Sequence, residues 1–121
     1  MPYKNIWEDN GVYRKYSNHI TGQEILQAAQ DVHGHALFDS IRYVINDLLE
    51  VTKHDISPHE IRSLAAIDKA ASITNSNIKI AIVATIPTIH AFSSLYSELI
   101  NKTPFSCEIF TCIGKARKWV I

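Results

Sequence analysis

Short apolar runs alternate along this chain with segments of helical periodicity, and this alternation limits the folds open to it. Ile41–Leu49, Ile78–Ala84 and Phe105–Thr111 are rich in β-branched or other apolar residues, as buried strands are. The segments between them repeat apolar residues every three or four positions, as helices do. The pattern predicts an α/β domain whose strands are mostly parallel and joined by right-handed crossovers.

Two capping boxes predict where two of the helices begin. Thr21 with Glu24, and Ser57 with Glu60, have the spacing at which each side chain hydrogen-bonds the backbone N–H of the other residue. We expect the first helix to end at Gly34, because glycine readily takes the left-handed conformation that closes many helices.

The chain opens with a predicted hairpin. Asn10-Gly11 favours a type I′ turn between strands Tyr3–Glu8 and Val12–Ile20, because both turn residues tolerate positive φ. The full predicted order is β-β-α-β-α-β-α-β-α. Residues 1–121 are therefore expected to form a single domain, with four helices beside a mixed, mostly parallel sheet of four or five strands.

Composition and charge indicate which binding partners and which cellular compartment to expect. Twelve basic and twelve acidic residues give a net charge of zero, without the basic excess typical of nucleic-acid binders. The small basic cluster of Lys115, Arg117 and Lys118 is interpreted as a solvated helix face. The polar N-terminus lacks the apolar core of a signal peptide, and no apolar run approaches membrane-spanning length. We expect a cytoplasmic protein with no integral membrane segment and with Cys107 and Cys112 unpaired.

The sequence contains no catalytic or cofactor motif that names a reaction. It lacks GxSxG, GxxxxGK[ST] and GxGxxG, and its four glycines do not cluster. Six histidines are present, but neither cysteine has a CxxC partner, and zinc-ligand spacing is absent. The expectation is a non-enzymatic protein without a metal or cofactor.

The best candidate ligand site by position is the edge of the sheet near Asp47. Asp47 comes near the C-terminal end of the predicted central strand, where ligands gather in open α/β sheets. The same edge should present His54, Ser57, Thr85 and Thr88, with Cys112 as a further neighbour. A small enzyme acting here is one hypothesis. The alternative is that Asp47 makes local hydrogen bonds without a functional role.

Four aromatic residues form a second candidate surface. Trp7, Tyr13, Tyr16 and Tyr43 fall in predicted strands, and the helices could leave the hairpin side of one sheet face uncovered. An exposed apolar face would serve as a homodimer interface or as a groove for a lipid-like ligand. The alternative is that these side chains complete the core.

The order of elements, with particular residues in it, resembles the SpoIIAA-like family of small bacterial proteins, which are related to STAS domains and grouped with Sec14-like proteins. The resemblance spans nearly the whole chain. The matching features are the opening hairpin, the Thr21-x-x-Glu24 helix start, an apolar strand ending in Asp47, the buried strand Lys79-Ile80-Ala81-Ile82-Val83, Phe110, and Ala116-x-x-Trp119. The resemblance implies a four- or five-stranded sheet with helices beside it.

The resemblance also suggests a regulatory serine. In STAS-type anti-sigma-factor antagonists, a phosphorylated serine begins the helix after the central strand, and Ser57 is the nearest equivalent here. The local pattern departs from that of the family, since seven residues separate Ser57 from Leu49, Pro58 follows it, and no glycine is present. Capping alone accounts for Ser57.

Three hypotheses about function follow. The first is a non-enzymatic regulatory domain that binds another protein or a second copy of itself. The second is a carrier of a small apolar or lipid-like ligand, and the third is the small enzyme at Asp47. A closed apolar cavity would favour the carrier, and a filled core with an exposed apolar patch would favour the interaction domain.

Overall fold

One sheet divides this protein into two unequal layers of helices. The structure is a computed structural model that describes residues 2–121. The elements are β1 (Tyr3–Trp7), β2 (Gly11–Thr21), α1 (Gly22–His33), a short 3-10 turn (Phe38–Ser40), β3 (Tyr43–Asp55), α2 (Pro58–Thr74), β4 (Lys79–Val83), α3 (Pro87–Ile100), β5 (Ser106–Phe110) and α4 (Ile113–Val120). This order confirms the predicted alternation.

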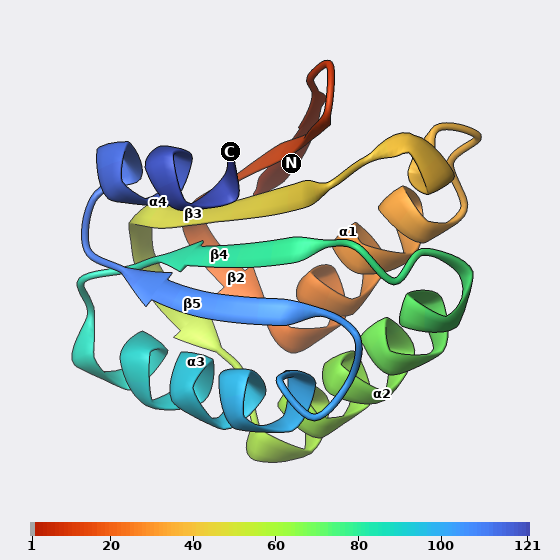
Figure 1. Cartoon of the computed structure of the whole chain (residues 1–121). Coiled ribbons are helices and arrows are strands. Elements are labelled where there is room, and N and C mark those ends of the chain that lie inside the picture. Colours follow the sequence, from red (N-terminus) through yellow and green to blue (C-terminus); the bar gives the residue numbers. More distant parts are fainter. Residues whose placement is uncertain (1) are drawn as a thin grey trace.

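The five strands lie in the sheet in the order of the sequence, β1-β2-β3-β4-β5. The β1–β2 pair is antiparallel, and the other three pairs are parallel. Helices α1, α2 and α3 cover one face, and α4 alone lies on the other (Figure 1). The α/β class, the mixed sheet and the four predicted helices are therefore confirmed.

Both predicted capping boxes are present and set the starts of α1 and α2. The Thr21 hydroxyl accepts a hydrogen bond from the Glu24 backbone N–H, and the Glu24 carboxylate accepts one from the Thr21 N–H. Ser57 and Glu60 make the same pair of bonds. Each box satisfies two N–H groups that the helix itself leaves without partners.

Strand β3 is longer than predicted, and this corrects one element boundary. The sequence predicts a strand that ends at Leu49, followed by a loop, but β3 continues to Asp55. Its second half stays paired with β2 from Ser17↔Glu50 to Thr21↔Asp55, across register shifts in the pair. The polar residues there are exposed strand positions, which resemble a loop in sequence.

Two glycines do not take the positive φ that their contexts predict. Within residues 2–121, Asn18 alone has a positive φ, so Asn10-Gly11 is not a type I′ turn and Gly34 closes α1 in a right-handed conformation. Gly11 is required for another reason. A Cβ atom there would lie 2.5 Å from the ring of Tyr43, so the neighbouring strand leaves no space for a side chain.

The two faces of the sheet have separate apolar cores. The larger core fills the space between the sheet and α1–α3, and includes Val12, Tyr16, Val44 and Ile82. The smaller core, beneath α4, consists of Ile45, Ala81, Val83, Ala116 and Val120. Within residues 2–121, no helix combines the length and the hydrophobicity that crossing a bilayer demands.

Candidate ligand-binding cavity

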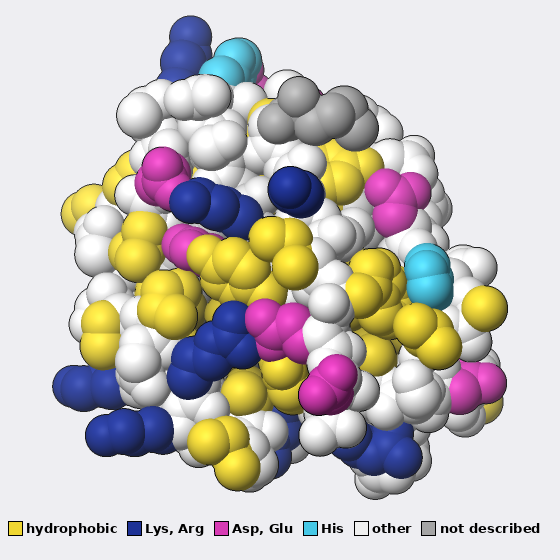
Figure 2. All heavy atoms as spheres, turned by 90° about the horizontal axis from the view of Figure 1, so that it is seen from above, with side chains coloured by type: hydrophobic (Ala, Val, Ile, Leu, Met, Phe, Trp, Pro, Cys, Tyr) yellow, Lys and Arg dark blue, Asp and Glu magenta, His cyan; other side chains and the backbone are white. Residues whose placement is uncertain are grey.

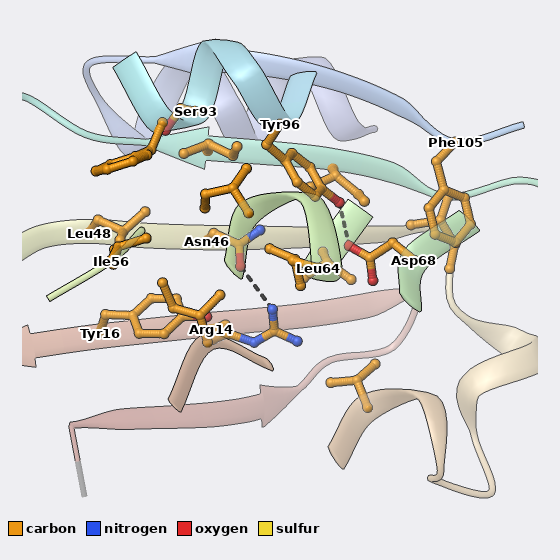
Figure 3. A pocket seen from close by; sticks show the side chains of 18 of the residues that line it. Arg14, Tyr16, Asn46, Leu48, Ile56, Leu64, Asp68, Ser93, Tyr96 and Phe105 are labelled. Atoms are coloured by element: carbon orange, nitrogen blue, oxygen red, sulfur yellow. Dashed lines mark hydrogen bonds between the residues drawn. The ribbon is translucent and has the colours of Figure 1, made fainter. Parts of the chain in front are cut away.

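The larger core contains a cavity of about 80 Å³ between the sheet and the layer of α1, α2 and α3 (Figure 3). Most of its wall is aliphatic or aromatic. The apolar lining residues are Tyr16, Ile25, Val32, Phe38, Val44, Leu48, Ile56, Ile61, Leu64, Ile78, Ile80, Ile82, Ile89, Phe92, Tyr96 and Phe105. The polar lining residues are Arg14, His33, Asn46, Asp68 and Ser93. An apolar cavity with a few convergent polar groups is the usual form of a small-molecule site.

Arg14 brings a positive charge into this wall from β2. Its side chain is 6% exposed and donates three hydrogen bonds, all to neutral oxygens. Nε bonds Asn5 Oδ1 at 2.7 Å, Nη1 bonds Asn46 Oδ1 at 2.9 Å, and Nη2 bonds the Ala28 carbonyl at 3.1 Å. Within residues 2–121, no ion pair or hydrogen bond joins Arg14 to a carboxylate.

A second polar group lies across the cavity wall, around Asp68 of α2. Asp68 is 7% exposed and accepts a hydrogen bond from the Tyr96 hydroxyl of α3. Its other oxygen lies 3.0 Å from Nε2 of His33, at the end of α1. Burial, followed by the nearby carboxylate, raises the pKa of Tyr96 well above its ordinary value, so this hydroxyl stays a donor. Asp68 thus ties the three helices together.

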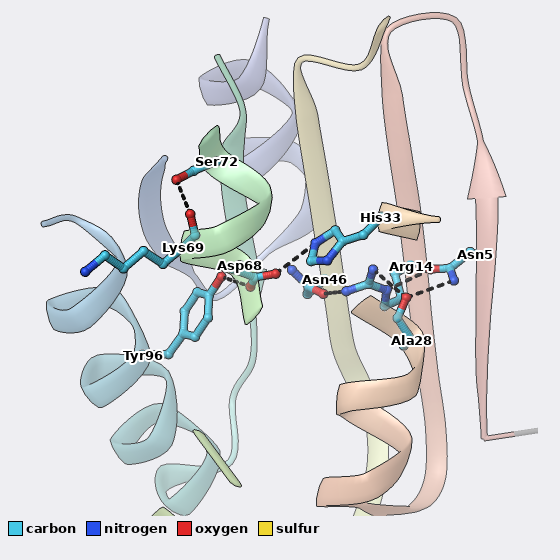
Figure 4. A network of polar contacts seen from close by, with 9 residues as sticks. All are labelled: Asn5, Arg14, Ala28, His33, Asn46, Asp68, Lys69, Ser72 and Tyr96. Atoms are coloured by element: carbon cyan, nitrogen blue, oxygen red, sulfur yellow. Dashed lines mark hydrogen bonds and ion pairs between the residues drawn. The ribbon is translucent and has the colours of Figure 1, made fainter. Parts of the chain in front are cut away.

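Figure 4 shows the two groups as separate parts of one polar row that crosses the core. Asn46 stands between them and bonds other groups on both sides: Oδ1 accepts from Arg14, and Nδ2 donates to the Ala81 carbonyl at 3.3 Å. The buried anion is therefore held by His33 and Tyr96, and the buried cation by neutral groups alone.

Sequence reasoning did not single out these residues, although periodicity carries a signal for them. Arg14 alternates with Val12 and Tyr16 along β2, which places it on the same inward face. Asp68 follows Leu64 by four positions, on the inward stripe of α2. A charged residue at an inward position is the detectable feature.

The structure does not bring the five residues of the predicted edge site together. Asp47 is buried within β3, where it accepts hydrogen bonds from the Tyr13 hydroxyl and, at 3.0 Å, from the Leu49 N–H. Tyr13 packs against the small core beneath α4, on the face of the sheet opposite the cavity. These bonds match the alternative interpretation of Asp47, in which its carboxylate makes local hydrogen bonds. Burial and the bond to Asp47 raise the pKa of Tyr13 to about 12.

His54 and Thr88 do meet. Nε2 of His54 lies 2.8 Å from Oγ1 of Thr88, and the His54 ring packs edge-on against Phe92, a residue of the cavity wall. Within residues 2–121, Nδ1 of His54 is buried and has no hydrogen-bond partner. Thr85 and Cys112 are exposed. Ligand binding at these positions stays a prediction.

Ser57 holds the helix cap through both its oxygen and its backbone N–H. Its hydroxyl also lies 3.1 Å from the Glu60 carboxylate. In this structure Ser57 caps the helix. Phosphorylation of Ser57 stays a prediction.

The four strand aromatics divide between the two faces of the sheet. Tyr16 is buried in the larger core, and Trp7 packs against that core and stacks on His35 at 4.0 Å between ring centres. Tyr13 and Tyr43 lie on the α4 side. They do not form the one continuous open surface that the sequence suggested.

Figure 2 views the protein from the α4 side and shows hydrophobic atoms interrupted by basic and acidic side chains. Arg117 of α4 is paired with Glu8, with Nη1 at 2.6 Å from Oε1 and Nη2 at 2.8 Å from Oε2. Within residues 2–121, no group of three or more His, Cys, Asp or Glu side chains is placed to hold a metal ion.

Comparisons with known proteins identify the fold. One solved structure is similar over 98% of this chain and 92% of its own, with a TM-score of 0.53 and 13% sequence identity. It is an uncharacterised protein of the DUF3478 family from Shewanella loihica PV-4 and has a SpoIIAA-like fold. The chain has a SpoIIAA-like fold. No family model and no curated protein matches the sequence. The SpoIIAA-like resemblance drawn from the sequence is confirmed at the level of the fold.

Proposed function

We propose that this SpoIIAA-like protein binds a small, mainly apolar molecule in the cavity between the sheet and α1–α3. The observation that carries the proposal is the cavity itself, with its largely apolar wall. This is the carrier hypothesis, and a cavity with a largely apolar wall favours it over a pure interaction domain.

The energetic cost of the cavity supports a function. Protein interiors are close-packed, and voids larger than a water molecule are few. Apolar wall atoms that face a cavity of about 80 Å³ lack the van der Waals contacts that a filled core would give them. One larger side chain in the wall would supply those contacts. A ligand regains the same contacts while it is bound, because its atoms supply the missing neighbours.

The volume limits the ligand to a few heavy atoms unless the walls move. An engineered apolar cavity of about 150 Å³ in another protein binds benzene or xenon. The cavity here has roughly half that volume, so xenon is a suitable first probe, and a ligand with a four-carbon chain requires the wall to move.

The test follows the methyl groups of cavity-lining isoleucine and leucine residues by ¹³C NMR under xenon pressure, and then with 1-butanol. We expect saturable shifts at Leu64, Ile80 and Ile82, with the methyl group of exposed Ile73 as an internal reference. Shifts spread evenly over the surface, or no saturable shift, would contradict the proposal.

Two neighbouring serines of α3 provide a matched pair of variants. Ser93 is buried and lines the cavity, whereas Ser94 is exposed on the same helix. Ser93→Leu places about two additional heavy atoms in the cavity and should abolish the xenon shifts. Ser94→Leu makes the same change outside it and should preserve them.

The sequence favours a regulatory or protein-interaction role, and this stays a second candidate. The observation in its favour is the α4 side of the sheet, where Ile6 remains 38% exposed and Tyr13 and Tyr43 are half-buried. The charged groups that interrupt this surface make it less suited to a dry interface than a continuous patch would be.

A further inference from the structure

We infer that the ligand of this cavity is an anion, a short-chain carboxylate whose head group pairs with Arg14. The inference rests on the proposed function and adds the chemical class and orientation of the ligand. It is carried by the contacts of the guanidinium, which is 6% exposed yet bonded to neutral oxygens alone.

The donors of Arg14 favour this class of ligand. A guanidinium carries five N–H groups, and the bonds to Asn5, Asn46 and Ala28 use three of them. One N–H on each terminal nitrogen takes no part in these three bonds, and the neighbouring neutral oxygen that these two N–H groups can reach is the Tyr16 hydroxyl. Two N–H groups on neighbouring nitrogens match the spacing of the two carboxylate oxygens, which is why arginine binds carboxylates with two parallel hydrogen bonds.

The charge balance of the core favours an anion over a neutral polar group. Burying a charge is costly unless an opposite charge and hydrogen bonds compensate for it. The other buried charge in the wall, Asp68, is already bonded to His33 and Tyr96. An incoming carboxylate therefore meets a cation that folding has already removed from water, so binding adds only the desolvation of the ligand itself.

The surroundings of Arg14 also orient the ligand. Figure 3 shows Tyr16, Leu48 and Ile56 grouped toward one end of the cavity and Asp68 and Phe105 toward the other, with Arg14 and Asn46 between. The end at Asp68 is polar, whereas the end at Leu48 and Ile56 is apolar and favours contact with a hydrocarbon chain. The apolar chain is thus directed toward Leu48 and Ile56, and burial raises the pKa of Tyr16, which keeps its hydroxyl a neutral donor there.

The experiment compares butanoate with 1-butanol, two probes of equal chain length that differ in the charge of the head group. Affinities are measured at pH 7 by the saturable methyl shifts of Leu64 and Ile82. We expect butanoate to bind at least about tenfold more tightly, the factor that one hydrogen bond to a charged group provides. We also expect the Arg14 side-chain ¹⁵N–¹H signals to shift with butanoate and not with butanol.

Each outcome separates this inference from the proposed function. If butanol binds as tightly as butanoate or more tightly, the inference is overturned and the cavity proposal stands. If neither binds in the cavity, both are overturned. Arg14→Met, which keeps the length of the side chain without its charge, should abolish the preference for butanoate and retain butanol binding. If Arg14→Met does not fold, the affinities and the Arg14 signals of the unaltered protein decide the question.

Discussion

The two faces of the sheet differ in the size and composition of the apolar cores that cover them. Beneath α4, five buried residues (Ile45, Ala81, Val83, Ala116 and Val120) pack closely around small side chains, and the charged groups lie at the rim. On the α1–α3 side, the core is much larger, contains a cavity of about 80 Å³ and holds a cation and an anion in its wall. The closely packed face stabilises the fold, whereas the hollow face carries the features of a site.

The largest expected effect tests this difference by truncation of one isoleucine on each face. Ile45 is fully buried beneath α4, and Ile82 lines the cavity. Ile45→Ala should lower the free energy of unfolding by about 4 kcal/mol. Ile82→Ala should cost about 2–3 kcal/mol, because part of the isoleucine side chain already faces empty space. Urea denaturation measures both, and equal losses would argue against a real cavity.

Each face also has a tyrosine that donates to a buried aspartate, which gives a second matched comparison. Tyr96 is 4% exposed and bonds Asp68, whereas Tyr13 is half-buried and bonds Asp47. Tyr96→Phe should cost about 2 kcal/mol, since it removes one of the two groups that hold a buried charge. Tyr13→Phe should cost about 1 kcal/mol, because Asp47 keeps the Leu49 N–H and water can reach the site. A reversed order in thermal and urea denaturation would contradict this account of the two networks.

Adding a methylene should affect the faces in opposite directions. Val83 is fully buried beneath α4, and Val44 lines the cavity. Val83→Ile should destabilise the protein by about 1 kcal/mol, because overfilling a packed core forces strained rotamers. Val44→Ile should be neutral or stabilising by up to about 0.8 kcal/mol, the value of one buried methylene. Urea denaturation of the two variants measures both effects. If both faces were equally packed, the unfolding midpoints of Val83→Ile and Val44→Ile would shift in the same direction.

The smallest effect concerns the pH dependence of the rim beneath α4. Hydrogen bonds from Arg117, and then from Tyr43, hold the pKa of Glu8 below its ordinary value. A carboxyl whose pKa is lower in the folded protein stabilises the fold above the unfolded pKa, and this contribution is lost as the pH falls through the folded pKa. Glu8→Gln should therefore be less stable near pH 7 by under about 1 kcal/mol, since Arg117 is partly exposed.

The same contribution should vanish at low pH. The stabilities of Glu8→Gln and the unaltered protein should converge once the pH has fallen below the lowered pKa of Glu8 in the folded protein, because Glu8 is then protonated in both states. Urea denaturation at pH 7 and pH 3 measures the convergence. A difference that is independent of pH would show that Glu8 acts through packing instead.

Much of the fold could be predicted from the sequence because its signals are local. The Thr21 and Ser57 capping boxes act within one helical turn, and the strand that contains Ile80 and Ile82 is marked by its own apolar residues. The end of β3 could not be predicted in this way. Its exposed residues after Leu49 are polar, and their pairing with β2 depends on a partner about 33 positions away.

The candidate site was harder to predict than the fold. The periodicity of β2 and α2 shows that Arg14 and Asp68 face inward. It does not show their partners, because Asn46 beside Arg14 and His33 beside Asp68 come from other elements. The cavity has no sequence signal at all, because it is the space that residues of seven elements leave between them. Of the predicted edge residues, His54 and Thr88 meet, whereas Asp47 lies apart from His54 because β3 continues between them.

The Glu60 carboxylate of the second capping box has a consequence for the dipoles of two helices. Helices α1 and α2 each connect two parallel strands and lie side by side, so their N-termini lie at the same end of the molecule. Each N-terminus carries a partial positive charge of about half an elementary charge. A Cβ atom at residue 22 would lie 2.0 Å from the Glu60 carboxyl carbon. The absence of a side chain at Gly22 lets one carboxylate cap α2 and face the start of α1. Two parallel dipoles that would repel each other thereby share a counter-charge.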